Sequence, residues 1–260
     1  SLGCVIEPWI WVSVVAAAGL AGWTDAIAGG GGLLTVPALL ACGLPPHLAL
    51  GTNKLQALVG SGTAAWQFHR SGWVNLRDCG QGFLLACVAG ACGSFAVQWV
   101  DPGILRRGIP LLLLVVTLVV AAQPRFGSAA GRPGPMRAKT ERWMALVLGF
   151  YDGFFGPGTG TFWTAALVTW GGLELTAATA RTKVMNFASN LGAWIVFAAG
   201  GAVAWPIGLS MGAAQAAGAR LGAAMAAKGG RRFIRPVFLG VVVVLILRLA
   251  WDAWHNGDRA

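Results

Sequence analysis

The sequence has little charge. Its 260 residues include 19 lysines and arginines and only nine aspartates and glutamates, so charged residues make up 11% of the chain. Soluble domains carry about a quarter charged residues, which excludes an ordinary water-soluble protein. The five cysteines form no Cys-x-x-Cys pair and have no histidine at a metal-ligand spacing. This excludes a zinc site and a disulfide framework, and no metal or cofactor is expected.

Apolar and small residues dominate instead. Hydrophobic residues make up 56% of the chain, with 39 glycines, 13 tryptophans and a mean hydropathy of +0.67. Glycine lets helices approach closely and tryptophan favours the bilayer interface, so this composition predicts an all-α, polytopic membrane protein. At about 20 residues per span there is room for about eight or nine crossings. The tryptophans suit lipid or a second copy of the chain, and a homo-oligomer stays open.

The net charge of +10 does not indicate a nucleic-acid partner, because the basic residues lie in short stretches between apolar runs. That placement is typical of cytoplasmic loops. The first apolar run is preceded by Glu7 and by no basic residue. We therefore expect it to be a retained segment and not a cleaved signal peptide.

Apolar runs divide the chain into two transmembrane units, residues 1–122 and 141–260, joined by a cytoplasmic linker at 123–140 that is rich in proline, glycine and arginine. Each unit contains five predicted helical segments. In the first unit they are 9–28, 33–42, 47–68, 78–100 and 104–122. In the second they are 141–155, 159–170, 175–199, 205–227 and 233–251.

The two units resemble each other in the order of their unusual residues. The matching stretches are Gly22-Trp-Thr-Asp25 with Gly149-Phe-Tyr-Asp152, the glycines at 29–32 with the stretch 156–160, and Thr52-Asn-Lys54 with Arg181-Thr-Lys183. Chance similarity between glycine-rich sequences does not readily place an aspartate, a glycine cluster and a lysine in one order twice. The sequence therefore predicts an internal duplication.

An odd number of segments in each unit makes the two repeats inverted. With a cytoplasmic linker, most basic residues fall on the cytoplasmic side, as the positive-inside rule requires. Both termini are then periplasmic.

Two predicted segments, 33–42 and 159–170, are only 10 and 12 residues long. They are too short to cross about 30 Å at about 1.5 Å per residue. Each follows a glycine cluster, and paired interrupted segments at matching places indicate a central binding site in transporters. A broken helix exposes N–H groups and a positive dipole end, which attract an anion. Close helix packing is the alternative explanation for four consecutive glycines.

Ionisable residues inside apolar segments are costly and indicate a function. Lys54 and Lys183 offer positive charge, and neighbouring amides offer donors, which is the composition an anionic headgroup requires. The predicted substrate-binding set is Asn53, Lys54, Gln56, Arg181, Lys183, Asn186 and Asn190, with the helix-break residues Gly31, Gly32, Gly158, Thr159 and Gly160. Arg181 is included as a second cation close to Lys183.

Structural alternatives stay open for the four intramembrane charges. In the alternative, each lysine forms an ion pair, Lys54 with Asp25 and Lys183 with Asp152, or reaches toward the interface. Each aspartate lies four residues before its glycine cluster. It is therefore placed either to cap the N–H groups at the break or to carry a coupling proton.

The motifs resemble those of the TauE/SafE sulfite exporter family. The first repeat is similar over Gly22-Trp-Thr-Asp-Ala-Ile-Ala-Gly-Gly-Gly-Gly-Leu-Leu-Thr-Val-Pro37, Leu44-Pro-Pro-His47 and Leu50-Gly-Thr-Asn-Lys-Leu-Gln56. The second is similar over Gly149-Phe-Tyr-Asp-Gly-Phe-Phe-Gly-Pro-Gly-Thr-Gly160, Lys183-Val-Met-Asn186 and Ser189-Asn190. The resemblance implies a secondary transporter that moves sulfite, sulfoacetate or other organosulfonates outward across a bacterial inner membrane.

The expected protein is thus a carrier for a small anion, embedded in the lipid bilayer and working by alternating access between two inverted repeats. Two other classes remain as alternatives. One is an anion channel. The other is a membrane thiol enzyme, for which the chain lacks a Cys-x-x-Cys pair and a nucleophile with a matched base.

Overall fold

A computed structural model describes residues 7–121 and 138–256. Within these ranges the chain is helical and contains no strand. Most of the predicted linker, residues 123–137, lies outside the described residues.

Nine α-helices and one short 3-10 helix are described. The first unit contains α1 (Pro8–Ala28), α2 (Gly31–Ala41), α3 (Pro46–Arg70), η1 (Leu76–Cys79), α4 (Gly80–Gln98) and α5 (Pro102–Ala121). The second contains α6 (Ala138–Phe154), α7 (Thr159–Thr169), α8 (Leu175–Ala199) and α9 (Trp205–Asn256). The predicted segments are confirmed as helices, with ends that differ by a few residues.

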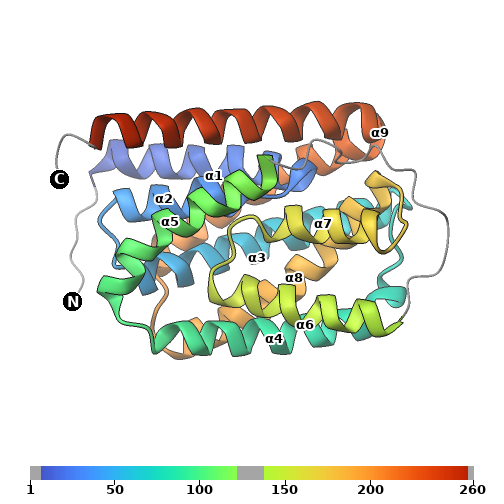
Figure 1. Cartoon of the computed structure of the whole chain (residues 1–260), viewed down its shortest axis with the longest axis horizontal. Coiled ribbons are helices and arrows are strands. Elements are labelled where there is room, and N and C mark those ends of the chain that lie inside the picture. Colours follow the sequence, from blue (N-terminus) through green and yellow to red (C-terminus); the bar gives the residue numbers. More distant parts are fainter. Residues whose placement is uncertain (1–6, 122–137, 257–260) are drawn as a thin grey trace.

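The last two predicted segments form one continuous element, α9, with a break inside it. Gly230 has φ 54° and ψ −151°, which is not helical. In Figure 1 the chain reverses its direction there, so the second part of α9 runs back beside the first helices. The two predicted segments are therefore real, and no loop separates them.

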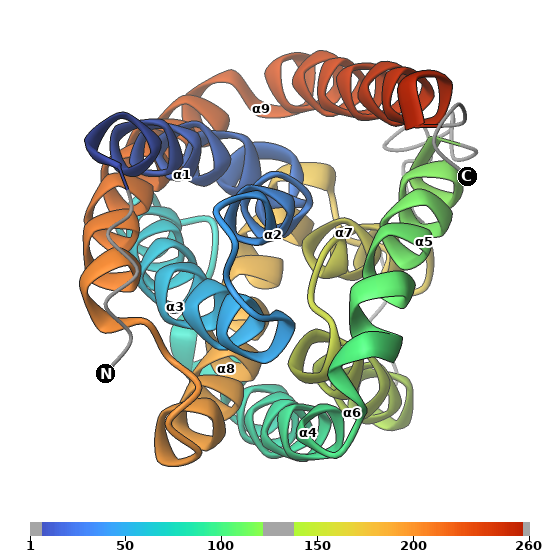
Figure 2. The same cartoon turned by 90° about the vertical axis from the view of Figure 1, so that its left-hand side faces the viewer.

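The long helices run roughly parallel or antiparallel along the long axis of the molecule (Figure 1). Seen from one end, α2, α3 and α7 lie inside a ring that includes α1, α4, α5, α6 and α9 (Figure 2). The long helices α3 and α8 each bury more than half of their 25 residues. Lys54 and Lys183 are among these buried residues, so both lysines face protein.

The two short helices begin at glycines whose backbone is left-handed. Gly30, before α2, has φ 91°, and Gly158, before α7, has φ 82°. Only glycine adopts this conformation without strain, so the glycine clusters end the preceding helix and start a new one. The predicted break is confirmed at both places. Figure 1 shows α2 and α7 running in opposite directions from the middle of the molecule.

The helices of the two units pack across each other. α1 packs mainly on α9, and α6 packs mainly on α4. Glycines make these contacts possible: a Cβ at Gly218 would lie 1.9 Å from the Gly19 carbonyl oxygen, and one at Gly153 would lie 2.0 Å from the Gly90 carbonyl oxygen. The high glycine content therefore serves close backbone contact between helices.

Large apolar side chains cover the outside of the bundle. Exposed examples come from every long helix: Leu20, Trp66, Leu84, Ile104, Val147, Ile195 and Leu209. By length and composition, α1 and the segment Leu76–Gln98 qualify as membrane spans among the described residues. α3 and α8 are long enough, with 25 residues each. They carry buried polar residues that lower their hydropathy without exposing polar atoms to lipid.

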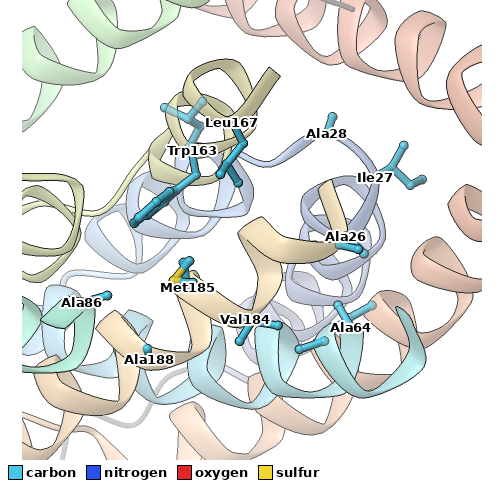
Figure 3. Close-up of a cluster of buried hydrophobic side chains, with 14 of the residues drawn as sticks. Ala26, Ile27, Ala28, Ala64, Ala86, Trp163, Leu167, Val184, Met185 and Ala188 are labelled. Carbon is cyan, nitrogen blue, oxygen red and sulfur yellow. The ribbon is translucent and has the colours of Figure 1, made fainter. Parts of the chain in front are cut away.

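A core of small and large apolar residues holds the short helix α7 in place. Figure 3 shows Trp163 and Leu167 of α7 pointing toward α8, where Met185 lies. All three side chains are at most 1% exposed. This packing fixes the break before α7 relative to α8, the helix that carries Lys183.

Candidate functional site

The two helix breaks touch each other in the interior. The Thr161 hydroxyl donates to the Ala28 carbonyl oxygen at 3.2 Å. A Cβ at Gly29 would lie 2.5 Å from the Thr161 backbone nitrogen, so this glycine also allows close approach. Both explanations of the glycine cluster therefore apply: Gly29 and Gly30 both have a positive φ and turn the chain, and Gly29 also packs closely against α7. The N-termini of α2 and α7, each with a positive dipole end, converge on one region.

Four charged residues surround this region as two ion pairs, and three of them are buried while Asp25 is partly exposed. Lys54 of α3 lies 2.9 Å from Asp152 of α6, and Lys183 of α8 lies 3.0 Å from Asp25 of α1. The lysine side chains are 1% and 0% exposed. Each pair joins a lysine of one unit to an aspartate of the other.

The pairing within each unit, Lys54 with Asp25 and Lys183 with Asp152, is therefore wrong. Each lysine reaches instead the end of the broken helix contributed by the other unit. Lys54 also donates to the backbone carbonyl oxygen of Asp152, and Lys183 to that of Asp25. A positive charge at a helix C-terminus stabilises the helix dipole.

The two aspartates have different second partners. The Oδ1 atom of Asp25 accepts from the backbone N–H of Gly31 at 3.1 Å, in the first turn of α2. Asp152 accepts from the hydroxyl of Ser189 in α8. Asp25 thus caps the helix that follows it, whereas Asp152 is tied to a neighbouring long helix.

A small pocket lies between the breaks and the ion pairs. It is lined by Asp25, Gly30, Gly31, Gly32, Asn53, Lys54, Ala57, Ser61, Asp152, Gly156, Gly158, Thr159, Gly160, Asn186, Asn190 and Gln215. Its volume is about 30 Å³, which is room for about one or two water molecules. An oxyanion is larger, so binding one requires the walls to move apart.

Most of the predicted site residues meet at this pocket, from both units. Three do not line it. Lys183 lies behind Asp25 and contacts the pocket through that carboxylate. Gln56 donates to the side-chain oxygen of Asn53 at 2.8 Å, and so positions a residue that does line it.

Arg181 is the third, and its position differs most from the expectation. Its guanidinium pairs with Glu141 of α6 and donates to the carbonyl oxygen of Asp78 at 3.3 Å. Residues two apart on a helix do not face the same side, so proximity to Lys183 in the sequence does not bring Arg181 to the pocket. The matching residue, Thr52, is also engaged outside the pocket, since its hydroxyl accepts from the Ala204 N–H at 2.9 Å.

Sequence reasoning missed Gln215 of α9 and Ser61 of α3, both of which line the pocket. Gln215 is 3% exposed, and its Oε1 atom is buried with no partner. The sequence indicates this residue, because it is a single amide side chain in a stretch of alanine and glycine. Ser61 lies two turns after Lys54 on the same helix face, as Asn190 does after Lys183.

Several amide oxygens at the site have unsatisfied hydrogen-bonding capacity. Asn186 Oδ1, Asn190 Oδ1 and Gln56 Oε1 are buried without a partner, like that of Gln215. Buried polar atoms without partners are rare in folded proteins and call for an explanation. Together with two ammonium groups and two helix N-termini, they make a polar interior suited to a small charged or polar ligand.

Comparison with known proteins agrees with this architecture. The family model described as Sulfite exporter TauE/SafE matches residues 14–249. A probable membrane transporter protein, ORF9, from Sinorhizobium sp. is 40% identical over 239 residues, 92% of each chain. A probable membrane transporter protein from Haemophilus influenzae is 40% identical over 91% of this chain and 93% of its own. YfcA of Escherichia coli K12, a probable membrane transporter protein, is 39% identical over 90% of this chain and 87% of its own.

No solved structure matches the chain. The family match nevertheless covers nearly all of its helices, and the relatives align over almost their full length. These findings agree with the helical bundle, its apolar exterior and its polar interior. The chain belongs to the TauE/SafE sulfite exporter family and is a membrane transporter, not an enzyme.

Proposed function

We propose that the protein exports small sulfur-containing anions, such as sulfite, sulfoacetate or related organosulfonates, across a bacterial inner membrane. The observation that carries this proposal is the meeting of two helix N-termini and two buried lysines around one pocket. Backbone N–H groups and ammonium groups are the usual partners of oxyanions in proteins.

The pocket supports a mechanism of alternating access. It lies where the two units meet and contains residues of both, as expected of the central site in a transporter built from two repeats. Corresponding contacts recur on either side of it. The hydroxyl of Thr35 donates to the side-chain oxygen of Asn53 at 2.6 Å, and the Thr164 and Thr182 hydroxyls lie 3.0 Å apart. Such pairing supports two inverted repeats that move relative to each other around the site.

The basic residues support a cytoplasmic assignment for one end of the bundle. α3 ends, α6 begins and α9 reverses at the same end of the molecule (Figure 1). Near these helix ends the sequence carries Arg70, Arg77, Lys139, Arg142 and Lys228. The positive-inside rule then makes this end cytoplasmic. α1 begins at the opposite end, which becomes periplasmic.

A thermal-shift screen of the purified protein tests the substrate class. Sulfite, sulfoacetate, taurine, sulfate and carboxylate analogues are compared, because a ligand that binds only the folded form raises the apparent Tm. We expect the largest shifts from the sulfur oxyanions. A set of sulfur anions that leaves the Tm unchanged, while a carboxylate raises it, would contradict the assignment.

Transport measurements in proteoliposomes separate a carrier from a channel. A carrier saturates and shows faster uptake when the same anion is present on the opposite side. Unitary currents in a planar bilayer would contradict the carrier mechanism.

A further inference from the structure

We propose that Asp25 is a proton-binding site and that the transporter binds one proton together with a monovalent anion. This inference rests on the proposed function, because it concerns the same pocket. The described site contains two lysines and two aspartates. Their formal charges cancel, so the pocket is neutral before any substrate enters.

A neutral buried pocket is a poor host for an anion. Adding a negative charge would leave that charge uncompensated in a region of low dielectric constant, which is costly. A proton taken up by a carboxylate removes this cost, because the pocket and its contents then remain neutral. The positive charge that attracts the anion is already present but is occupied by the protein's own carboxylates.

The Asp25 carboxylate is itself bound by groups that typically bind an anion. One of its carboxylate oxygens lies 3.0 Å from the Lys183 ammonium group, and the other accepts the Gly31 N–H at 3.1 Å. A lysine and a helix N-terminus are the groups that would bind an oxyanion. Protonation of the Asp25 carboxylate neutralises it and releases both groups to the substrate.

Asp25 is better placed for this exchange than Asp152. The Asp25 side chain is 16% exposed, compared with 5% for Asp152. Both carboxylate oxygens of Asp152 are bound by side chains, Lys54 and Ser189. Asn186, Asn190 and Gln215 line the same pocket, and the side-chain oxygen of each is a buried acceptor that has no donor. A protonated carboxyl group is a donor of the kind they lack.

The other titratable groups of the described helices around Asp25 are the two lysines of the site or side chains exposed to solvent. Of the described elements packed against α1, α3 and α8 contribute Lys54 and Lys183 to the site, and α2 and α7 contain no titratable residue. The described basic side chains of α9 are exposed, namely Arg220, Lys228 and Arg232. Tyr151, next to Asp152, donates a hydrogen bond from its hydroxyl to the Pro157 carbonyl oxygen at 2.7 Å.

Under this proposal, the bound proton and the monovalent anion together carry no net charge through the protein.

Titration calorimetry with isethionate tests the coupling. This sulfonate keeps one negative charge at all pH values near neutrality, so any proton taken up on binding goes to the protein. The binding heat is measured at one pH in two buffers with different ionisation enthalpies. We expect uptake of about one proton per anion, and an affinity that falls about tenfold per pH unit over the range of that uptake.

The variant Asp25→Asn keeps an oxygen that accepts the Gly31 N–H but cannot take up the proton. We expect it to bind isethionate without proton uptake and without pH dependence. Glu141→Gln changes a carboxylate outside the pocket and serves as the matched control, with uptake retained. Binding by the unaltered protein without proton uptake would overturn the proposal, and so would uptake that persists in Asp25→Asn. Failure of every sulfur anion to bind is a different result, which overturns the proposed function itself.

Discussion

The Lys54–Asp152 and Lys183–Asp25 pairs are built from corresponding residues of the two halves, yet their surroundings differ. Asp152 is the more enclosed aspartate, held by Lys54 and Ser189. Asp25 is more exposed and holds the first turn of α2 through Gly31. The long helices differ as well: the pocket is lined by Ala57 and Ser61 on α3 and by Asn186 and Asn190 on α8. One pair therefore has an enclosed aspartate held by two side chains, and the other has a more exposed aspartate beside two amides.

We expect the greatest loss of stability when the lysine of an ion pair is replaced, and the size of the loss should differ between the two pairs. Lys54→Met leaves the buried Asp152 carboxylate uncompensated, which costs about 3–5 kcal/mol of stability. Lys183→Met should cost less, because Asp25 keeps its backbone N–H partner and is more exposed. Apparent Tm values in detergent measure the difference.

Crossed double variants then test which charges are paired. Asp152→Asn should restore most of the stability lost in Lys54→Met, whereas Asp25→Asn should not. Rescue by Asp25→Asn in place of Asp152→Asn would show that the charges pair within each unit.

The next effect concerns the helix crossings. Gly218→Ala in α9 and Gly153→Ala in α6 each place a Cβ about 2 Å from a facing carbonyl oxygen, so the helices must shift. We expect each to cost about 1–3 kcal/mol. Gly212→Ala, also in α9, is the matched control, because its Cβ would lie 3.5 Å from the nearest atom. Equal Tm values for Gly212→Ala and Gly218→Ala would contradict the close packing.

The smallest effect is expected at Arg181, whose guanidinium and partner Glu141 are each 21% exposed. Arg181→Ala should lower stability by less than about 1 kcal/mol, as for other partly exposed ion pairs. The affinity for sulfur anions should stay unchanged, because the side chain is outside the pocket. A large loss of affinity at unchanged Tm would return Arg181 to the binding site.

The sequence predicted the helices well because its signals are local. Apolar runs set the helix lengths, and glycine clusters set the two breaks through the backbone freedom of glycine. The intramembrane lysines and aspartates were recognisable because ionisable residues in apolar segments are costly. Gln215 carried the same kind of signal but was overlooked in a run of small residues.

The partners of these residues were not recognisable. Each lysine pairs with an aspartate that is distant in the chain. The separation is 98 positions for Lys54 and 158 positions for Lys183. The nearer aspartate in sequence was the obvious candidate and the wrong one. Arg181 was placed with Lys183 for the same reason, although the turn of the helix points them to different sides.

Membrane helices, two interruptions at glycines and four charges within the helices are predictable from the amino-acid sequence. These properties depend on residue type and on neighbours within a few positions. That the interruptions meet, and that the charges pair crosswise around one pocket, depends on contacts between distant helices. Packing between distant helices, made possible by glycines facing backbone carbonyls, brings those groups together.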